Sequence, residues 1–238
     1  MGHMWRTWIQ SAAIGWSLAG ALTAFSLTAQ SDLHLPLVVI ILGPPGSGKT
    51  TQATALSKKY RIPTISISGL LKKQLGKQER PSDFIKMSAA SGDVLEDGAA
   101  NQLMEARLLQ GDLSHGFILD GYPVTVAQAK FLDGFLKDKG MPQPAVVMLD
   151  APDEVVRRRM LARHRVDDTV KIVDRRLSDY QAERQLLIDW YTPENLLRVD
   201  ATQAIPQVFR QIDHLITENV INKPRPLRSG DVDTTSAK

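Results

Sequence analysis

The chain of 238 residues contains no cysteine, few aromatic residues and only a small excess of positive charge. Without cysteine it can form neither a disulfide nor a zinc site with thiolate ligands, so the sequence gives no redox evidence for a compartment. A formal net charge of +3 is too small to favour nucleic acid as a partner. The hydrophobic fraction of 43% is ordinary for a globular protein. Setting both ends aside leaves about 190 residues, enough for one domain with its own core.

Residues 1–30 resemble a targeting segment more than a part of that domain. Residues 1–3 resemble a vector-derived scar before a native Met4. After Arg6, residues 8–29 contain no charged side chain. This pattern suits a signal peptide, a membrane anchor of about 20 residues or an amphipathic extension. Export, membrane anchoring and organelle targeting therefore stay open, and membrane contact through residues 8–29 is one of the alternatives.

The most informative stretch is a continuous apolar run followed by a glycine-rich loop. Leu37–Leu42 contains only Leu, Val and Ile, and Gly43–Thr50 matches the pattern GxxxxGK[ST] in full. Glycines let the backbone turn tightly, so that amide N–H groups can face a triphosphate. The helix expected next adds its positive N-terminal end. Lys49 is expected to reach the β- and γ-phosphates, and the Thr50 hydroxyl is expected to bind Mg²⁺.

Apolar runs alternate with helical patterns along the rest of the chain. The expected strands are Leu37–Leu42, Thr64–Ile67, Phe117–Asp120, Ala145–Asp150 and Leu196–Asp200. The expected helices are Thr51–Tyr60, Gly69–Leu75, Ser82–Ser91, Ala99–Gln110, Val126–Lys139, Asp153–Ala162, Thr169–Asp189 and Ile205–Glu218. This alternation predicts an α/β fold of the P-loop NTPase type, with helices on both faces of a parallel sheet. We expect the domain to span residues 37–220 and residues 222–238 to form a disordered tail.

Two polar residues beyond the loop suit a nucleotide site. Asp120 ends the apolar stretch Phe117–Asp120, where P-loop enzymes place a carboxylate that holds Mg²⁺, partly through water. Gln128 carries an amide that can both donate to and accept from the edge of a base. An aspartate at such a place can instead cap a turn or a helix, which is the lesser alternative, and a glutamine taken alone is commonly just solvated.

A group of arginines suits the binding of a polyphosphate. Its members are Arg159, Arg163, Arg165 and Arg176. Arginines in such a run often form no more than a solvated helix face. Asp167 and Asp168 directly follow Arg165 and favour the binding interpretation, because carboxylates can orient guanidinium groups.

Taken in order, these motifs resemble the adenylate kinase family of nucleoside monophosphate kinases. The resemblance covers residues 37–216 and rests on Gly43–Gln52, Ile62–Ser66, Gly92–Leu95, Phe117–Pro123, Gln128, Arg165–Asp168 and Arg176–Leu177. It implies transfer of the γ-phosphoryl group of ATP to a nucleoside monophosphate, with AMP as the first expectation and Mg²⁺ as cofactor. It also implies a helical NMP-binding segment near residues 66–95, a short lid, and a monomer that works in the cytoplasm.

The resemblance implies roles for individual residues as well. ATP is expected to be bound by Gly46, Ser47, Gly48, Lys49, Thr50, Thr51, Arg159 and Arg163. The acceptor is expected to be bound by Ile67, Lys72, Asp93, Val94, Leu95, Gly121, Gln128, Arg165 and Arg176. Catalysis is expected from Lys49, Arg159, Arg165 and Arg176, of which the last two would bridge the donor and acceptor phosphates. Mg²⁺ is expected on Thr50 and Asp120.

The acceptor side departs from the family pattern. Val124 stands where the family has an arginine on the AMP phosphate, Ile67 replaces a threonine, and Gly69 and Lys72 replace an aspartate and a second arginine. A missing arginine removes charge-assisted hydrogen bonds of about 1.5–3 kcal/mol each, and a lysine lacks the bidentate fork. Three interpretations stay open. They are a slow adenylate kinase, a kinase for another nucleoside monophosphate, and a nucleotide-binding module that has lost catalysis.

Overall fold

The centre of the domain is a parallel sheet of five strands. A computed structural model describes residues 36–75, 95–163 and 168–222. Within these ranges the strands are β1 (Leu37–Leu42), β2 (Thr64–Ile65), β3 (Gly116–Asp120), β4 (Ala145–Asp150) and β5 (Leu196–Asp200). Their order is β2-β3-β1-β4-β5, and every neighbouring pair is parallel. The predicted α/β fold is confirmed.

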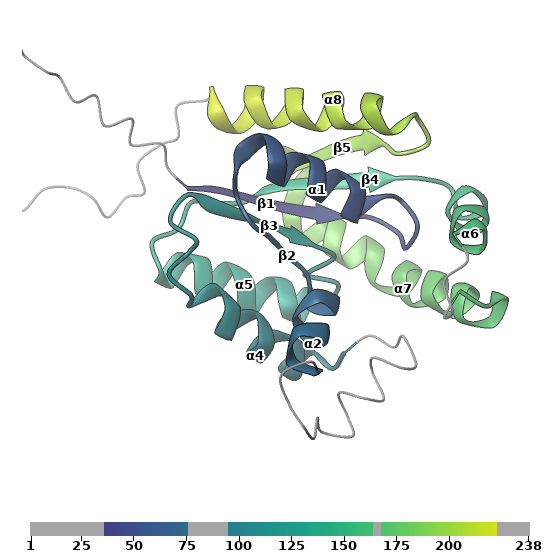
Figure 1. The fold of residues 1–238 in the computed structure, drawn as a ribbon, viewed down its shortest axis with the longest axis horizontal. Helices are drawn as coiled ribbons and strands as arrows, with labels where there is room; N and C mark the ends of the chain where they lie inside the picture. The colour runs from purple at the N-terminus through teal and green to yellow at the C-terminus, as the bar shows by residue number, and fades with distance from the viewer. Residues whose placement is uncertain (1–35, 76–94, 164–167, 223–238) are drawn as a thin grey trace, which may run out of the picture. The chain divides into compact units, whose positions relative to one another are not determined.

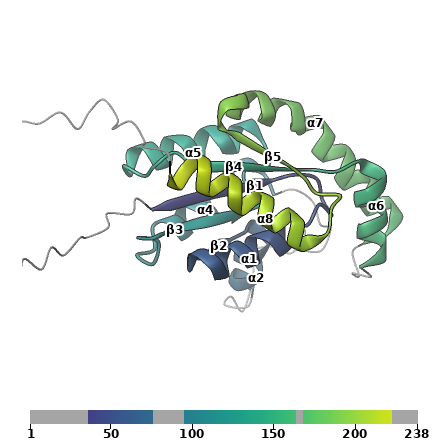
Figure 2. The same cartoon turned by 90° about the horizontal axis from the view of Figure 1, so that it is seen from above.

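Helices cover both faces of this sheet (Figures 1 and 2). They are α1 (Lys49–Tyr60), α2 (Ile67–Leu75), α4 (Asp97–Leu108), α5 (Val126–Asp138), α6 (Asp153–Ala162), α7 (Val170–Asn195) and α8 (Ile205–Ile216), and a π-helical turn, η1 (Thr217–Ile221), follows α8. Helices α1 and α8 lie on one face, and α4, α5 and α7 lie on the other. A connection through a helix is what two adjacent parallel strands require.

The central strand shows why both faces need cover. Successive side chains of a strand point to opposite faces of its sheet. Val38 and Ile40 accordingly pack in the core beneath α4, α5 and α7, whereas Val39 and Ile41 pack in the core beneath α1 and α8. All four side chains are fully buried. The continuous apolar run of β1 is therefore a consequence of burial on both sides.

One predicted boundary is wrong for a local reason. The apolar pattern predicts Ile67 as the last residue of a strand, but β2 ends at Ile65 and Ile67 begins α2. The hydroxyl of Ser66 accepts a hydrogen bond from the backbone N–H of Gly69 at 3.1 Å. This is the contact of a helix N-cap, and it starts the helix at once after Ser66.

A second boundary is wrong because of packing. The sequence pattern predicts that the long helix ends at Asp189, but α7 continues to Asn195. Leu187 and Tyr191 on this helix are buried in the core, which stabilises turns that a local pattern does not predict. The predicted helix Ser82–Ser91, the segment 1–30 and nearly all of the predicted tail lie outside the described residues. In the ranges that the structure describes, no helix combines the length and hydrophobicity needed to cross a membrane.

Leu119→Ala should lower the free energy of unfolding by about 2–5 kcal/mol, because it removes buried methyl groups and leaves a cavity. Leu119 lies in β3 and is fully buried. Urea unfolding followed by circular dichroism measures the change. Leu186→Ala, in which a half-exposed side chain of α7 is truncated, serves as the control and should stay within about 0.5 kcal/mol of the parent. Equal losses in the two variants would contradict this core assignment.

Candidate active site

The glycine-rich loop joins β1 to α1, and its backbone packs closely against β4 and α6. Gly43 and Gly46 have φ angles of +140° and +83°, which side chains rarely adopt. A Cβ atom at Gly43 would lie 2.6 Å from the carbonyl oxygen of Leu149 in β4. A Cβ atom at Gly46 would lie 2.8 Å from the carbonyl oxygen of Val156 in α6. Glycine is therefore required at both positions, by conformation and by space.

The first turn of α1 is suited to an anion. Its N-cap is Gly48, which offers no side-chain hydrogen bond, and the first turn contains no acidic residue. The N-terminal amide groups of a helix need acceptors, and the helix dipole favours a negative one. The loop Gly43–Thr50 therefore runs into a helix start with no acidic residue and no side-chain cap, and the binding of phosphate there stays a prediction.

Lys49 folds back over the loop. Its Nζ donates hydrogen bonds to the carbonyl oxygens of Gly43 at 2.8 Å and Pro44 at 2.9 Å. Burial of the ammonium group lowers the pKa of Lys49 to about 8, an effect that the negative charge of Asp120 opposes and the positive charge of Arg163 reinforces. Burial removes part of the hydration of the Lys49 ammonium group, and the hydrogen bonds that replace it go to two uncharged carbonyl oxygens. A polyphosphate would supply the negatively charged oxygen acceptors that this ammonium group lacks.

Thr50 and Asp120 meet beside the loop. The Thr50 hydroxyl donates to Oδ2 of Asp120 at 2.6 Å, and Asp120, at the end of β3, is 9% exposed. Mg²⁺ prefers such oxygen ligands and commonly takes one or two from the protein, the rest coming from phosphates and water. No cluster of three or more His, Asp or Glu residues that could hold a metal occurs in the described part of the chain. The pair fits a Mg²⁺ ion that a nucleotide brings with it.

Asp168 holds two of the predicted arginines together. Its side chain is only 1% exposed. Its Oδ1 accepts from Nη2 of Arg163 at 2.9 Å and from Nη1 of Arg176 at 3.2 Å, and its Oδ2 accepts from Nε of Arg163. Arg163 is also the arginine whose charge lowers the pKa of Lys49. The structure therefore brings together Lys49, Arg163 and Arg176, with one buried carboxylate to orient the two guanidinium groups.

Arg159 is directed elsewhere. Its Nη1 donates to the carbonyl oxygen of Ala201 at 2.7 Å, and its Nη2 donates to that of Thr202 at 3.2 Å. These residues belong to the loop between β5 and α8, and Gln52 of α1 contacts the first residue of α8 through the carbonyl oxygen of Ile205 at 3.1 Å. The phosphate role predicted for Arg159 stays a prediction. The sequence offered no motif for this loop, because its contacts are made by backbone carbonyl groups.

The predicted acceptor residues divide into several groups. Lys72 is exposed on α2, Ile67 packs at the edge of the core, and Leu95 is buried in it. Gly121 lies beside Lys49, since a Cβ atom there would be 3.6 Å from Cε of that lysine. The remaining predictions, Asp93, Val94 and Arg165, lie outside the described residues.

Gln128 is held in a hydrogen-bond network that the sequence pattern does not predict. It is 1% exposed. Its Oε1 accepts from the backbone N–H of Val124 at 2.9 Å, and its Nε2 donates to Oδ1 of Asp97 at 2.8 Å. Thr125 caps α5 by accepting from the Gln128 N–H. The spacing Thr-x-x-Gln at a helix start was an available signal for part of this network.

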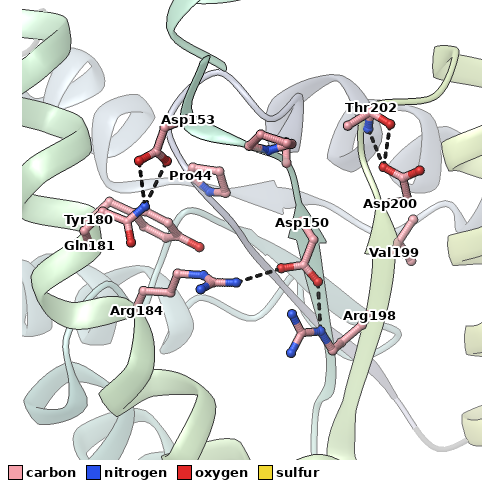
Figure 3. A pocket seen from close by; sticks show the side chains of 12 residues that line it. Pro44, Asp150, Asp153, Tyr180, Gln181, Arg184, Arg198, Val199, Asp200 and Thr202 are labelled. Carbon is pink, nitrogen blue, oxygen red and sulfur yellow. Dashed lines mark hydrogen bonds and ion pairs between the residues drawn. The ribbon is translucent and has the colours of Figure 1, made fainter. Parts of the chain in front are cut away.

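A pocket of about 810 Å³ opens at the ends of β4 and β5 beside α7 (Figure 3). At its centre Asp150 accepts hydrogen bonds from Arg184 at 3.2 Å and from Arg198 at 2.8 Å, and Gln181 of α7 contacts Asp153 at its rim. Pro44 of the glycine-rich loop lines the same pocket. Its charged residues come from positions far apart in the chain and match no local motif, so the sequence did not reveal it.

Known proteins resemble the chain over this whole region. A family model described as adenylate kinase matches residues 41–196. Adenylate kinase 1 of Nostoc sp. (strain PCC 7120) is 38% identical over 175 residues, which cover 73% of this chain and 95% of the relative. The adenylate kinase of Rhodococcus erythropolis is 35% identical over 170 residues, covering 71% and 93%. The adenylate kinase of Clostridium beijerinckii is 34% identical over 213 residues, covering 76% and 99%.

The family match spans the glycine-rich loop, Asp120 and the cluster of Asp168 with its arginines, on the parallel sheet that the family resemblance implied. The predicted resemblance is confirmed. The chain belongs to the adenylate kinase family of nucleoside monophosphate kinases.

Proposed function

We propose that the protein transfers the γ-phosphoryl group of ATP to AMP and so forms two molecules of ADP. The observation that carries the proposal is the placement of Lys49 inside the glycine-rich loop, close enough to Arg163 for the two charges to interact, with Arg163 joined to Arg176 through Asp168. Phosphoryl transfer spreads negative charge over the oxygens of the moving group, and positioned cations stabilise it. Such a cluster is what transfer between two nucleotides requires.

The residues have separate roles in this proposal. The amide groups at the start of α1 hold the ATP phosphates, and Lys49 turns from the Gly43 and Pro44 carbonyls to the β- and γ-phosphates. Thr50 and Asp120 would hold Mg²⁺, which neutralises phosphate charge when it is bound. Arg163 stays on the ATP side, and Arg176 reaches the phosphates of both nucleotides. The family names of the relatives support AMP as the acceptor.

A different nucleoside monophosphate is the second candidate acceptor. Val124 supports it, because an apolar side chain stands where the family places a phosphate-binding arginine. The Val124 N–H is committed to Gln128, so the backbone does not supply a free donor in its place. If the AMP phosphate is bound more weakly, contacts to the base determine which monophosphate is used as the acceptor.

The full chain should produce ADP from ATP and AMP in a coupled assay, and CMP, UMP and GMP should be weaker acceptors.

Lys49→Ala should lower kcat by about 100-fold or more, which corresponds to about 2.7 kcal/mol of transition-state stabilisation. Lys58→Ala, in which an exposed lysine of the same helix is removed, is the matched control and should keep normal turnover. ATP binding without turnover of any acceptor would point to a nucleotide-binding module. Full activity of a folded Lys49→Ala protein would contradict the proposed site.

Arg176→Ala should lower kcat more than it weakens ATP binding, because Arg176 is proposed to touch both nucleotides in the transition state. Titration calorimetry with a non-hydrolysable ATP analogue and the coupled assay separate the two effects. Arg157→Ala breaks an exposed ion pair with Asp174 and is the control for loss of one positive charge. A loss restricted to ATP affinity in Arg176→Ala, with kcat intact, would refute the bridging role.

Val124→Arg should raise kcat/KM for AMP by about tenfold to a hundredfold, since a charge-assisted hydrogen bond is worth about 1.5–3 kcal/mol. ATP affinity should barely change, because Val124 is proposed to lie on the acceptor side. AMP is titrated at fixed ATP against both proteins. No gain with AMP, together with activity of the parent protein towards another monophosphate, would show a pocket specialised for that other acceptor.

A further inference from the structure

One carboxylate joins the start of α4 to the start of α5. Oδ1 of Asp97 accepts from Nε2 of Gln128 at 2.8 Å and from the hydroxyl of Thr125 at 2.9 Å. Oε1 of Gln128 in turn accepts from the backbone N–H of Val124 at 2.9 Å. Asp97 lies in the first turn of α4, and Thr125 is the N-cap of α5. These contacts tie the loop after β3 to a helix that is distant in the sequence.

The same contacts fix which way the Gln128 amide points. A backbone N–H can only donate, so it requires the oxygen of the amide. An ionised carboxylate can only accept, so it requires the NH₂ group. The two ends of the Gln128 amide are therefore distinguished by Val124 on one side and Asp97 on the other. Gln128 is 1% exposed, and water has little opportunity to replace either partner.

A further contact keeps Asp97 itself in place. The Tyr122 hydroxyl donates to Oδ1 of Asn101 at 2.7 Å. Tyr122 is fully buried in the core, as are Ala100 and Met104 on the inner side of α4. Asn101 lies one turn after Asp97, so the loop after β3 and the first turns of α4 are joined twice. A rigid support of this kind is what an orienting residue needs.

We propose that Asp97 is a positioning residue that sets the base preference of the acceptor site by holding the Gln128 amide in one orientation. The inference rests on the proposed function, in which Gln128 meets the acceptor base. Beyond its two side-chain contacts, the amide keeps one hydrogen and one oxygen lone pair for a ligand. Val124 and Asp97 together fix the order in which it presents them, and the Asp97 contact is the one of the two that a side-chain substitution removes.

This order decides between two purines of nearly the same shape. Adenine offers an N6 amine that donates beside an N1 atom that accepts. Hypoxanthine, the base of IMP, offers an O6 atom that accepts beside an N1–H group that donates. An amide that cannot turn over suits only one of these patterns, whereas an amide free to turn suits both. A site that leaves a polar group unpaired against the wrong base rejects that base strongly.

The test compares kcat/KM for AMP with kcat/KM for IMP in the full chain. The parent protein should prefer AMP, and Asp97→Ala should reduce this preference by about tenfold or more, because Nε2 loses its acceptor and only the Val124 N–H still distinguishes the two ends of the amide. Asp97→Ser fits the same place at the helix start, and its hydroxyl both donates and accepts, so it should shift the ratio in the same direction. Asp97→Ser also provides the test if Asp97→Ala does not fold.

Thr125→Val is the matched control. It removes the other hydrogen bond to the same Asp97 oxygen and the cap of α5, so it should lower stability while leaving the AMP to IMP ratio unchanged. A ratio that stays at the parent value in folded Asp97→Ala and Asp97→Ser would overturn the inference, and so would equal use of AMP and IMP by the parent protein. Absence of turnover with every monophosphate would instead contradict the proposed function.

Discussion

A buried ammonium group at the end of the central strand is the constraint on which the site depends. Lys49 is surrounded by the backbone of its own loop, bonded to two neutral carbonyl oxygens, and its pKa is lowered to about 8. Asp120 is the negative charge beside Lys49, and Arg163 adds a positive one. Asp168 pairs Arg163 with a third cation, Arg176. The three cations outnumber the two carboxylates, so the site has an excess of positive charge that a polyphosphate has the charge to satisfy.

The fold holds these charges in place through close backbone contacts. The loop can approach β4 and α6 only because Gly43 and Gly46 have no side chain. Helix α6 ends at the residue before Arg163, and Asp168 orients Arg163 towards Arg176 of α7. The loop, the two arginines and their carboxylate thus form one connected arrangement. Asp97 connects α4 to the loop after β3 and to α5, which gives the proposed acceptor side a rigid support of its own.

Features that depend on neighbouring residues could be predicted from the sequence, whereas features that depend on contacts distant in the chain could not. The strand Leu37–Leu42, its glycine loop and the following helix form a continuous pattern whose physics is contained in neighbouring residues, and the prediction was confirmed. The end of α7 depends on burial of Tyr191 against distant elements, so a local pattern placed it too early. The contact between Asp97 and Gln128, and that between Asp150 and Arg184, join residues far apart in the chain. A single sequence carries no signal that these residues contact one another.

The most direct measurement is the titration of the Lys49 side chain by NMR, in full-length protein with ¹⁵N- and ¹³C-labelled lysine and with Lys49→Arg to assign the signal. The pKa of Lys49 should be near 8 in the free protein. A non-hydrolysable ATP analogue with Mg²⁺ should raise this pKa, because phosphate oxygens stabilise the charged form. A pKa near the ordinary value of 10.5 in the free protein, or one that the analogue leaves unchanged, would contradict the account.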